Sequence, residues 1–494
     1  MTISVTFPVG GHRGGRHGMT LFGDLTRRKP IDQIEEGGAE TALTRTLGLW
    51  QLTAIGIGGI IGAGIFSLAG AVAHETAGPA VLISFLVAGV ASAAAAFSYA
   101  EFAGLIPRAG SAYTYGYAVL GEFTGWAIGW DLLLEYTAIV AVVAIGISGY
   151  FNDLLGFLHV HLPNWMAGAP GTEPHGVPEH SYKINLFAAL LCLLIAYVLN
   201  LGMKSAARFE SALVYLKVAI VLLVIVVGVF KIHAGNYSPF FPFGWGGAFT
   251  GAATVFFAVF GYDAMSTAAE ESKDSRKHMP MAILISLAIS MVLYVLACLV
   301  LTGMVPYTEI NPTAAFSSAF KSVGMNGLGL VIAVGAIVGI LTVLFTFMMG
   351  ATRVWFAMSR DGLLPGWFAR THPTRHVPTR ITWILGAGSA LIAGFFPIAE
   401  AAELTNIGIL LAFIVVCAAV IVLRYKRPDL PRQFRTPLMP FVPLVGICFS
   451  IWLITFLAWQ TWVRFAVWFV LGCVVYFAYG RRRSHLNKTE TAKG

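Results

Sequence analysis

A single lysine, Lys217, stands inside the apolar run LVYLKVAIVLLVIVVGVF, with apolar residues on both sides. A lysine at membrane depth costs about 2.5–3.5 kcal/mol on insertion scales, and ionisable residues in such places commonly serve ion or proton pathways. Lys217 is therefore the candidate proton carrier. The alternative is a structural role, in which the ammonium group pairs with a neighbouring acid or with helix carbonyls.

Acidic residues also interrupt apolar runs. Asp131 and Glu135 lie four residues apart in IGWDLLLEYTA, which places them on one face of a helix. Both are candidates to line a wet cavity. Glu135 lies deeper, and its depth favours the cavity role. For Asp131, a structural contact is the slightly better interpretation. A further acid, Asp263, follows Gly261 in the run FFAVFGYDAM.

Two apolar runs contain breaks in the pattern of a regular helix. Five glycines crowd the run LGLWQLTAIGIGGIIGAGIFSLAG between Gly56 and Gly64. Because glycine costs a helix about 1 kcal/mol relative to alanine, we expect this run to unwind near its middle. The alternative is that the glycines let neighbouring helices pack closely. The second break lies at Gly261, beside Asp263.

The chemistry of such breaks is specific. The free N–H groups of a half-helix bind a carboxylate, and unwound carbonyls accept hydrogen bonds from an ammonium group. Interrupted spans at corresponding places in two halves of a chain are the pattern of a transporter binding site. The combination suits the backbone of an amino acid.

The composition requires that these residues be positioned within a membrane. Of the 494 residues, 57% are hydrophobic and 11% are charged, whereas soluble chains carry about 25% charged residues. This excludes a soluble enzyme, a disordered protein and a nucleic-acid-binding protein, despite the net charge of +8. Long continuous apolar runs also exclude an outer-membrane barrel. The five cysteines lie in apolar runs and predict neither a disulfide framework nor a metal site.

The sequence predicts an all-α polytopic membrane protein with twelve spans. The sixth span comes five spans after the first, an odd number, so an inverted repeat of five helices would relate them. The expected organisation is a tail at 1–46, repeats at 47–230 and 248–424, two additional helices at 440–480, and a basic tail at 481–494. The spans are expected at 47–73, 79–105, 123–151, 184–201, 211–230, 248–269, 281–304, 328–357, 381–397, 403–424, 440–458 and 462–480.

The distribution of basic residues predicts the orientation. With the N-terminus inside, all but five of the 32 lysines and arginines lie at the cytoplasmic side. Such asymmetry is the positive-inside pattern, so both termini are expected in the cytoplasm, facing anionic lipid headgroups. The exceptions are Lys183, Lys231, Lys321 and Arg464 on the outer side, and Lys217 at depth.

The first residues predict no cleavable signal peptide, because 1–46 is polar and Gly-rich. Residues 1–18 have no apolar period and lead to a second methionine, Met19. Our hypothesis is that Met19 is the native start.

Five motifs give the chain a family likeness. They are IGGIIGAGIF, YAEFAGLIPRAGSAYTYGY, IGWDLLLEY, FFAVFGYDAMSTAAEE and TRVWFAMSRDGLLP, in this order. From about Leu21 to about Gly480 the chain resembles the amino acid–polyamine–organocation superfamily, and within it the cationic amino acid transporter branch. The resemblance implies a 5+5 inverted repeat plus two helices, which matches the twelve spans.

The resemblance also implies roles for individual residues. The amides of Ala63, Gly64 and Ile65 would bind the substrate carboxylate. Lys217 matches the fifth-span lysine that replaces a sodium ion in proton-coupled members, and Glu135 matches the third-span acid that faces the substrate side chain. The ring of Phe257 would act as a gate. The substrate ammonium group would be bound by the carbonyls of Ile60, Phe257, Ala258 and Phe260.

One residue departs from the family pattern. Ala63 stands between Gly62 and Gly64, where members often carry Ser or Thr, so a hydroxyl donor to the carboxylate is absent while the backbone amide remains. This puts the affinity or the preferred substrate in doubt.

The sequence therefore predicts a proton-coupled symporter of amino acids in the plasma (inner) membrane, and not an enzyme. A cationic substrate such as arginine, lysine or ornithine is expected, with a small neutral substrate such as alanine as the alternative. A membrane sensor or channel is the rival from another class. The expected partners are the amino acid, protons, anionic lipids and a small accessory membrane helix, with no cofactor, no metal and no nucleic acid.

Overall fold

The computed structural model describes residue 27 and residues 47–106, 111–173, 177–178, 180–201, 206–266, 269, 272–370 and 378–484, with side chains from 213 onward in the helix that begins at 206. The hypothesis that Met19 is the native start concerns residues outside this range.

The described part of the chain is helical, with only two isolated β-bridges. Apart from short 3₁₀ and π turns, the helices are α3 (Leu49–Ile60), α4 (Ala69–Val72), α5 (Val81–Leu105), α6 (Ser111–Val119), α7 (Glu122–Phe157), α8 (Asn164–Ala167), α9 (Leu186–Asn200), α10 (Ala206–Gly228), α11 (Gly244–Val255), α12 (Tyr262–Ser266), α13 (Ser275–Met304), α14 (Ala315–Ser322), α15 (Asn326–Arg360), α16 (Thr379–Phe395), α17 (Ile398–Lys426), α18 (Phe441–Ile454), α19 (Trp459–Val475) and α20 (Arg481–Arg483).

Helical segments overlap every span that the sequence predicts. Among the described residues, eight segments are long and apolar enough to cross a membrane, and one of them, Leu49–Leu105, contains two predicted spans. Three predicted spans fall on shorter apolar helices, α9, α16 and α18. A polytopic helical membrane protein is therefore confirmed, while the count of twelve crossings and the orientation of the termini stay predictions.

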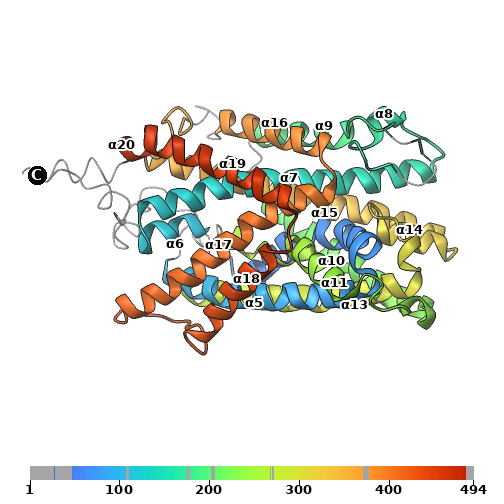
Figure 1. Ribbon diagram of the computed structural model, residues 1–494, viewed down its shortest axis with the longest axis horizontal. Helices are drawn as coiled ribbons and strands as arrows, with labels where there is room; N and C mark the ends of the chain where they lie inside the picture. Colours follow the sequence, from blue (N-terminus) through green and yellow to red (C-terminus); the bar gives the residue numbers. More distant parts are fainter. Residues whose placement is uncertain are drawn as a thin grey trace, which may run out of the picture.

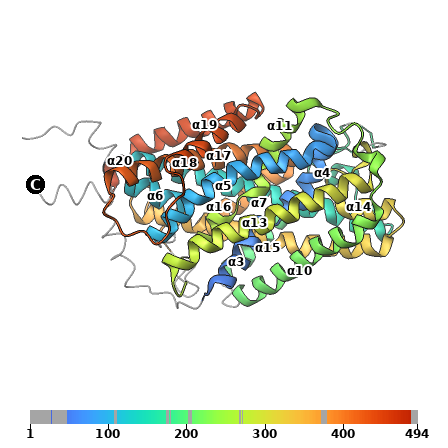
Figure 2. The same cartoon turned by 90° about the horizontal axis from the view of Figure 1, so that it is seen from below.

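The helices run roughly along the long axis of the molecule (Figure 1). Helices α6 and α20 lie at one end, and α8 and α14 lie at the other. The view from below shows α3 and α4, the two halves of the first span, in different parts of the bundle (Figure 2). Helix α7 packs against α15 and α17, while α5 packs against α13, α11 and α18.

The outer surface of the bundle is apolar. Only 17% of the most apolar stretch of the segment containing α19 is buried inside the molecule, and Val467, Val470, Leu471 and Val474 on this helix are exposed. Contiguous exposed apolar surface is typical of membrane contact. Two tryptophans fasten α19 to α7, because the indole Nε1 of Trp130 donates to the Trp468 carbonyl at 2.9 Å and that of Trp468 donates to the Trp130 carbonyl at 3.1 Å.

A buried ion-pair cluster connects α5 with α17 and with the loop that follows α17. Glu101, at the end of α5, is 3% exposed and pairs with Arg424 at the end of α17 and with Arg432 in the following loop. Its carboxylate also accepts a hydrogen bond from the Thr436 backbone N–H at 2.8 Å. The loop after α17 is thereby attached to the end of α5.

Candidate functional site

The first span breaks where its glycines predict. Helix α3 ends at Ile60, and Ile61 has extended backbone angles of φ −74° and ψ 107°. The chain becomes helical again with the π turn Gly64–Leu68, for which Ala63 is the N-cap. The amides of Ala63, Gly64 and Ile65 lie at the start of this second half-helix. The first N–H groups of a helix have no partner inside it, so these amides can bind a ligand.

The sixth span breaks as well. Helix α11 ends at Val255 and continues as a 3₁₀ turn over Phe256–Val259. Phe260 is extended, with φ −115° and ψ −176°. Gly261 has φ +120°, a left-handed conformation that a residue with a side chain rarely adopts, and α12 then begins at Tyr262.

The two breaks lie directly against each other. A Cβ added to Gly59 would come within 2.8 Å of the Gly261 carbonyl oxygen, and one added to Gly64 would come within 2.4 Å of the Ala258 Cβ. Only glycine allows backbones to approach this closely. The glycines of the first span therefore serve unwinding and close packing together, although the sequence presented these as alternatives.

Several carbonyls at the breaks have side-chain partners. The Tyr294 hydroxyl on α13 donates to the Ile60 carbonyl at 2.7 Å, which is one of the carbonyls expected to receive the substrate ammonium group. A carbonyl oxygen has two lone pairs, so this one retains a second acceptor position. At the sixth-span break, Ser92 on α5 donates to the Val259 carbonyl at 2.6 Å, and Asn406 on α17 donates to those of Ala253 and Thr254.

Lys217 is fully buried and reaches the first-span break. Its Nζ donates to the carbonyl of Gly58, in the last turn of α3, and lies 3.2 Å from the Thr342 Oγ1 on α15. The Thr342 hydroxyl itself donates to the Gly339 carbonyl at 2.8 Å, so it accepts from the lysine. Lys217 thus pairs with a carbonyl of the interrupted span, and its expected role as a proton carrier stays a prediction.

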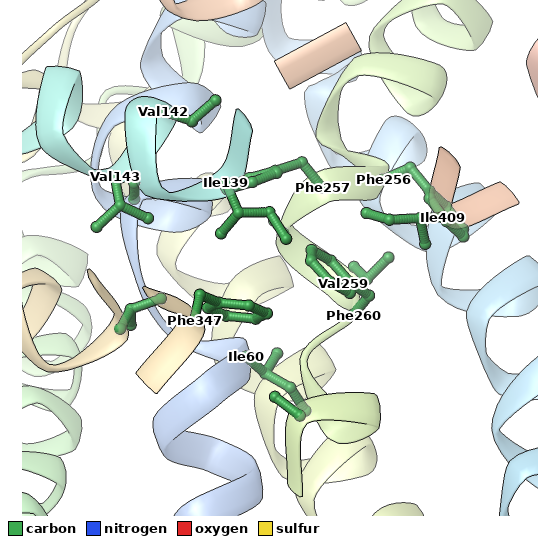
Figure 3. Packing of buried hydrophobic residues seen from close by; sticks show 14 of the residues in the cluster. Ile60, Ile139, Val142, Val143, Phe256, Phe257, Val259, Phe260, Phe347 and Ile409 are labelled. Atoms are coloured by element: carbon green, nitrogen blue, oxygen red, sulfur yellow. The ribbon is translucent and has the colours of Figure 1, made fainter. Parts of the chain in front are cut away.

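Apolar side chains fill the space beside the two breaks (Figure 3). Ile60, Ile139, Phe257 and Phe347 come from α3, α7, the sixth-span break and α15, and all are buried. The rings of Phe257 and Phe260 meet edge to face with centroids 5.9 Å apart. Phe257 is only 6% exposed, so its ring lies inside the bundle.

The three predicted acids, Asp131, Glu135 and Asp263, form one electrostatic group. Glu135 lies within electrostatic reach of Asp263 and Asp131, and the Tyr136 hydroxyl donates to Asp263 Oδ2 at 2.6 Å. Each acid is buried and keeps one oxygen without a hydrogen-bond partner, namely Asp131 Oδ1, Glu135 Oε2 and Asp263 Oδ1. Asp131 also lies against α17, because a Cβ on Gly408 would come within 2.7 Å of its Oδ1.

Sequence reasoning missed Tyr294, Ser92 and Asn406. Each is a polar side chain inside an apolar run, which is the signal that singled out Lys217 and Glu135. Neutral polar residues give a weaker signal, because they are less costly at membrane depth than charges.

Comparison with known proteins places the chain among transporters. The family model for amino acid permeases matches residues 47–479. A methylthioribose transporter of Bacillus subtilis is 46% identical over 464 residues, which is 94% of this chain and 99% of that protein.

Two further relatives transport amino acids according to their names. A branched-chain amino acid permease of Bacillus subtilis is 45% identical over 95% of this chain and 100% of its own length. A vacuolar cationic amino acid transporter of Arabidopsis thaliana is 36% identical over 82% of this chain and 68% of its own length. The likeness to the bacterial relatives thus extends over nearly the entire length of both chains.

Proposed function

Because the chain belongs to the amino acid permease family, and so to a family of transporters and not of enzymes, we propose that it is a proton-coupled amino acid symporter of the plasma membrane that works by alternating access. The observation that carries the proposal is the direct contact between the two helix breaks, Gly59 with Gly261 and Gly64 with Ala258. We also propose that the breaks are related by an inverted repeat of five helices.

The proposed site binds the amino acid backbone through main-chain groups. The amides of Ala63, Gly64 and Ile65 bind the carboxylate at the positive end of the outer half-helix. The carbonyls of Phe257, Ala258 and Phe260, with the second lone pair of the Ile60 carbonyl, bind the ammonium group. Phe257 closes over the substrate as a gate. The absence of a hydroxyl at Ala63 leaves carboxylate binding to the amides.

Lys217 is the proposed coupling residue. As an ammonium group it braces α3 from α10 and α15 through charge-assisted hydrogen bonds to the Gly58 carbonyl and Thr342 Oγ1, and such bonds are stronger than neutral ones. Loss of the proton weakens the brace and frees α3 to tilt, which opens the inner side. Because the opening that follows loss of the proton also releases the substrate, the proton and the substrate move inward together.

Two classes of amino acid, distinguished by their side chains, are candidate substrates. The apolar wall of Ile139, Phe257 and Phe347 beside the breaks favours a neutral, branched or small amino acid, and the branched-chain permease relative agrees with this. The cationic substrate predicted from the sequence remains the second candidate, because Glu135 and Asp263 each keep a buried oxygen without a partner that could accept from a cationic group.

Uptake into proteoliposomes tests the proposal. With an inward proton gradient the protein should accumulate a labelled amino acid above its outside concentration, and a protonophore should abolish the accumulation. A sensor would give no uptake, and a channel would never exceed equilibrium. Competition by leucine, alanine and arginine separates the side-chain classes: inhibition by arginine alone would support the cationic class.

Substitution of Lys217 tests the coupling. Lys217→Ala should retain binding of the amino acid but lose proton-driven accumulation, whereas the matched control Lys231→Ala, in the outer segment after α10, should behave like the wild type. Unchanged pH-dependent accumulation by Lys217→Ala would refute the coupling role.

A further inference from the structure

We propose that Asn406 on α17 is a positioning residue of the amino acid site, which fixes the carbonyls of the sixth-span break in the pattern that binds the substrate ammonium group. The inference rests on the proposed function, because it concerns the carbonyls that this function assigns to the substrate. Asn406 itself donates to the carbonyls that precede the break and needs no contact with the substrate.

The hydrogen bonds of Asn406 go to the carbonyls at the end of the outer half-helix. Its side chain is fully buried, and Nδ2 donates to the Ala253 carbonyl at 2.8 Å and to the Thr254 carbonyl at 3.0 Å. The last carbonyls of a helix lose their partners four residues on, and an unsatisfied backbone group at membrane depth costs several kcal/mol. Asn406 satisfies both carbonyls from another helix.

Asparagine suits this position because of its chemistry. A primary amide carries two N–H donors on one nitrogen, so a single side chain serves two neighbouring carbonyls. The orientation of the amide is fixed, because turning Oδ1 toward the carbonyls would place three acceptors together. The Oδ1 atom consequently points away and has no hydrogen-bond partner.

The same face of α17 follows the sixth span across its break. Phe413 lies seven residues after Asn406, or about two helical turns, and therefore on the same side. Its ring packs edge to face on Phe256, with centroids 5.5 Å apart, and stacks on Tyr262 at 5.8 Å. Ile409, between them in sequence, lies beside Phe256 (Figure 3). Helix α17 thus contacts the outer half-helix, the 3₁₀ turn and the inner half-helix.

The consequence concerns the carbonyls one turn further on. Without the amide donors, the carbonyls of Ala253 and Thr254 would regain bonds from the N–H groups of Phe257 and Ala258, which are the partners of a regular α-helix. The helix would then continue into the break and turn the carbonyls of Phe257, Ala258 and Phe260 away from the substrate. Affinity for the ammonium group would fall, while binding of the carboxylate by the first span would stay.

A ligand pair separates positioning from a general loss of structure. The amino acid that stabilises the wild type most in a thermal shift assay is compared with its α-deamino analogue, which keeps the carboxylate and lacks the ammonium group. Asn406→Leu, of similar size and without donors, should weaken binding of the amino acid about tenfold or more. Binding of the deamino analogue should be unchanged within about twofold.

Two further variants complete the series. Asn406→Ser, with one donor, should give an intermediate ratio of the two affinities, and it decides the question if Asn406→Leu is not monodisperse. Thr405→Val is the control, because the Thr405 hydroxyl donates only within its own helix, to the Ala401 carbonyl at 3.2 Å, and its ratio should match the wild type.

The outcomes distinguish the two proposals. Equal weakening of both ligands, or of neither, would overturn the positioning role of Asn406 while leaving the proposed function intact. A wild-type protein that binds no amino acid, or binds the deamino analogue equally well, would overturn the proposed function itself.

Discussion

The carboxylate of Glu101 and a second group of three buried acids lie in different parts of this molecule and differ in how many of their oxygens accept hydrogen bonds. Glu101 uses both oxygens: Oε1 accepts from Arg424 Nε at 3.2 Å and from Arg432 Nε at 3.0 Å, and Oε2 accepts from Arg424 Nη2 at 2.5 Å. The second group, Asp131, Glu135 and Asp263, is equally buried, yet each of its members keeps an oxygen without a partner.

This difference in hydrogen bonding distinguishes a structural carboxylate from candidate functional ones. A buried charge is stable when it is paired and hydrogen-bonded, and Glu101 meets this condition while joining α5, α17 and the loop after α17. An unpaired buried acid destabilises the fold, so it is retained where a ligand or proton completes it. The comparison therefore indicates a structural role for Glu101, and it supports the proposal that the three acids serve transport.

The largest expected effect is on the paired carboxylate. Glu101→Gln leaves Arg424 and Arg432 without their anion, and breaking a buried ion pair costs about 3–5 kcal/mol. We expect a clearly lower midpoint of thermal unfolding in detergent, with normal substrate affinity in whatever protein stays folded. A midpoint equal to that of the wild type would remove the structural half of the comparison.

The two arginines of the cluster should differ in a predictable order. The Arg432 side chain is 2% exposed and that of Arg424 is 21% exposed. Arg432 also donates to the Arg427 carbonyl at 2.9 Å and to that of Leu430 at 3.1 Å. Each buried group left without a partner costs about 1–3 kcal/mol, so Arg432→Ala should lower the unfolding midpoint more than Arg424→Ala. The reverse order would mean that the loop contacts contribute nothing.

The unpaired carboxylates should respond the other way. Glu135→Gln removes a buried charge that has no basic partner among its described contacts, so the free energy of unfolding should stay within about 1 kcal/mol of the wild type or rise. Uptake should fall by at least tenfold, because the proposed site loses an acid. Asp131→Asn, nearer the end of the span, should change uptake less. Normal uptake by Glu135→Gln would contradict its place in the site.

The smallest effect is expected at an exposed pair. Hydrogen bonding to Arg427 holds the pKa of the Asp429 carboxyl below its usual range, and both side chains are more than half exposed. A lowered pKa in the folded state stabilises the fold at neutral pH, and this stabilisation is lost as the pH falls through the folded-state pKa. Asp429→Asn should therefore lower the unfolding midpoint slightly at pH 7 and not at all in strong acid. A large effect at pH 7 would show that exposed pairs matter as much as the Glu101 cluster.

The sequence allowed the two helix breaks to be predicted, because membrane depth makes every departure from an apolar helix costly. Glycine spacing located both breaks, and Lys217 was conspicuous as a charge in an apolar run. What remained hidden depended on contacts between distant segments. Nothing in the sequence indicates that Tyr294 reaches the Ile60 carbonyl, that Asn406 reaches α11, or that Glu101 meets arginines more than 320 residues away.

The paired tryptophans of α7 and α19 give the molecule an internal optical reporter. The rings of Trp130 and Trp468 stack with centroids 4.7 Å apart, and Trp126 stacks on Trp130 at 5.5 Å. Each of the three indole N–H groups donates to a backbone carbonyl of the opposite helix, so separation of the helices would change the surroundings of these rings and with them their fluorescence emission. The emission of this stack would therefore record, without any attached dye, whether the last helix travels with α7 during a transport cycle or stays behind in the lipid.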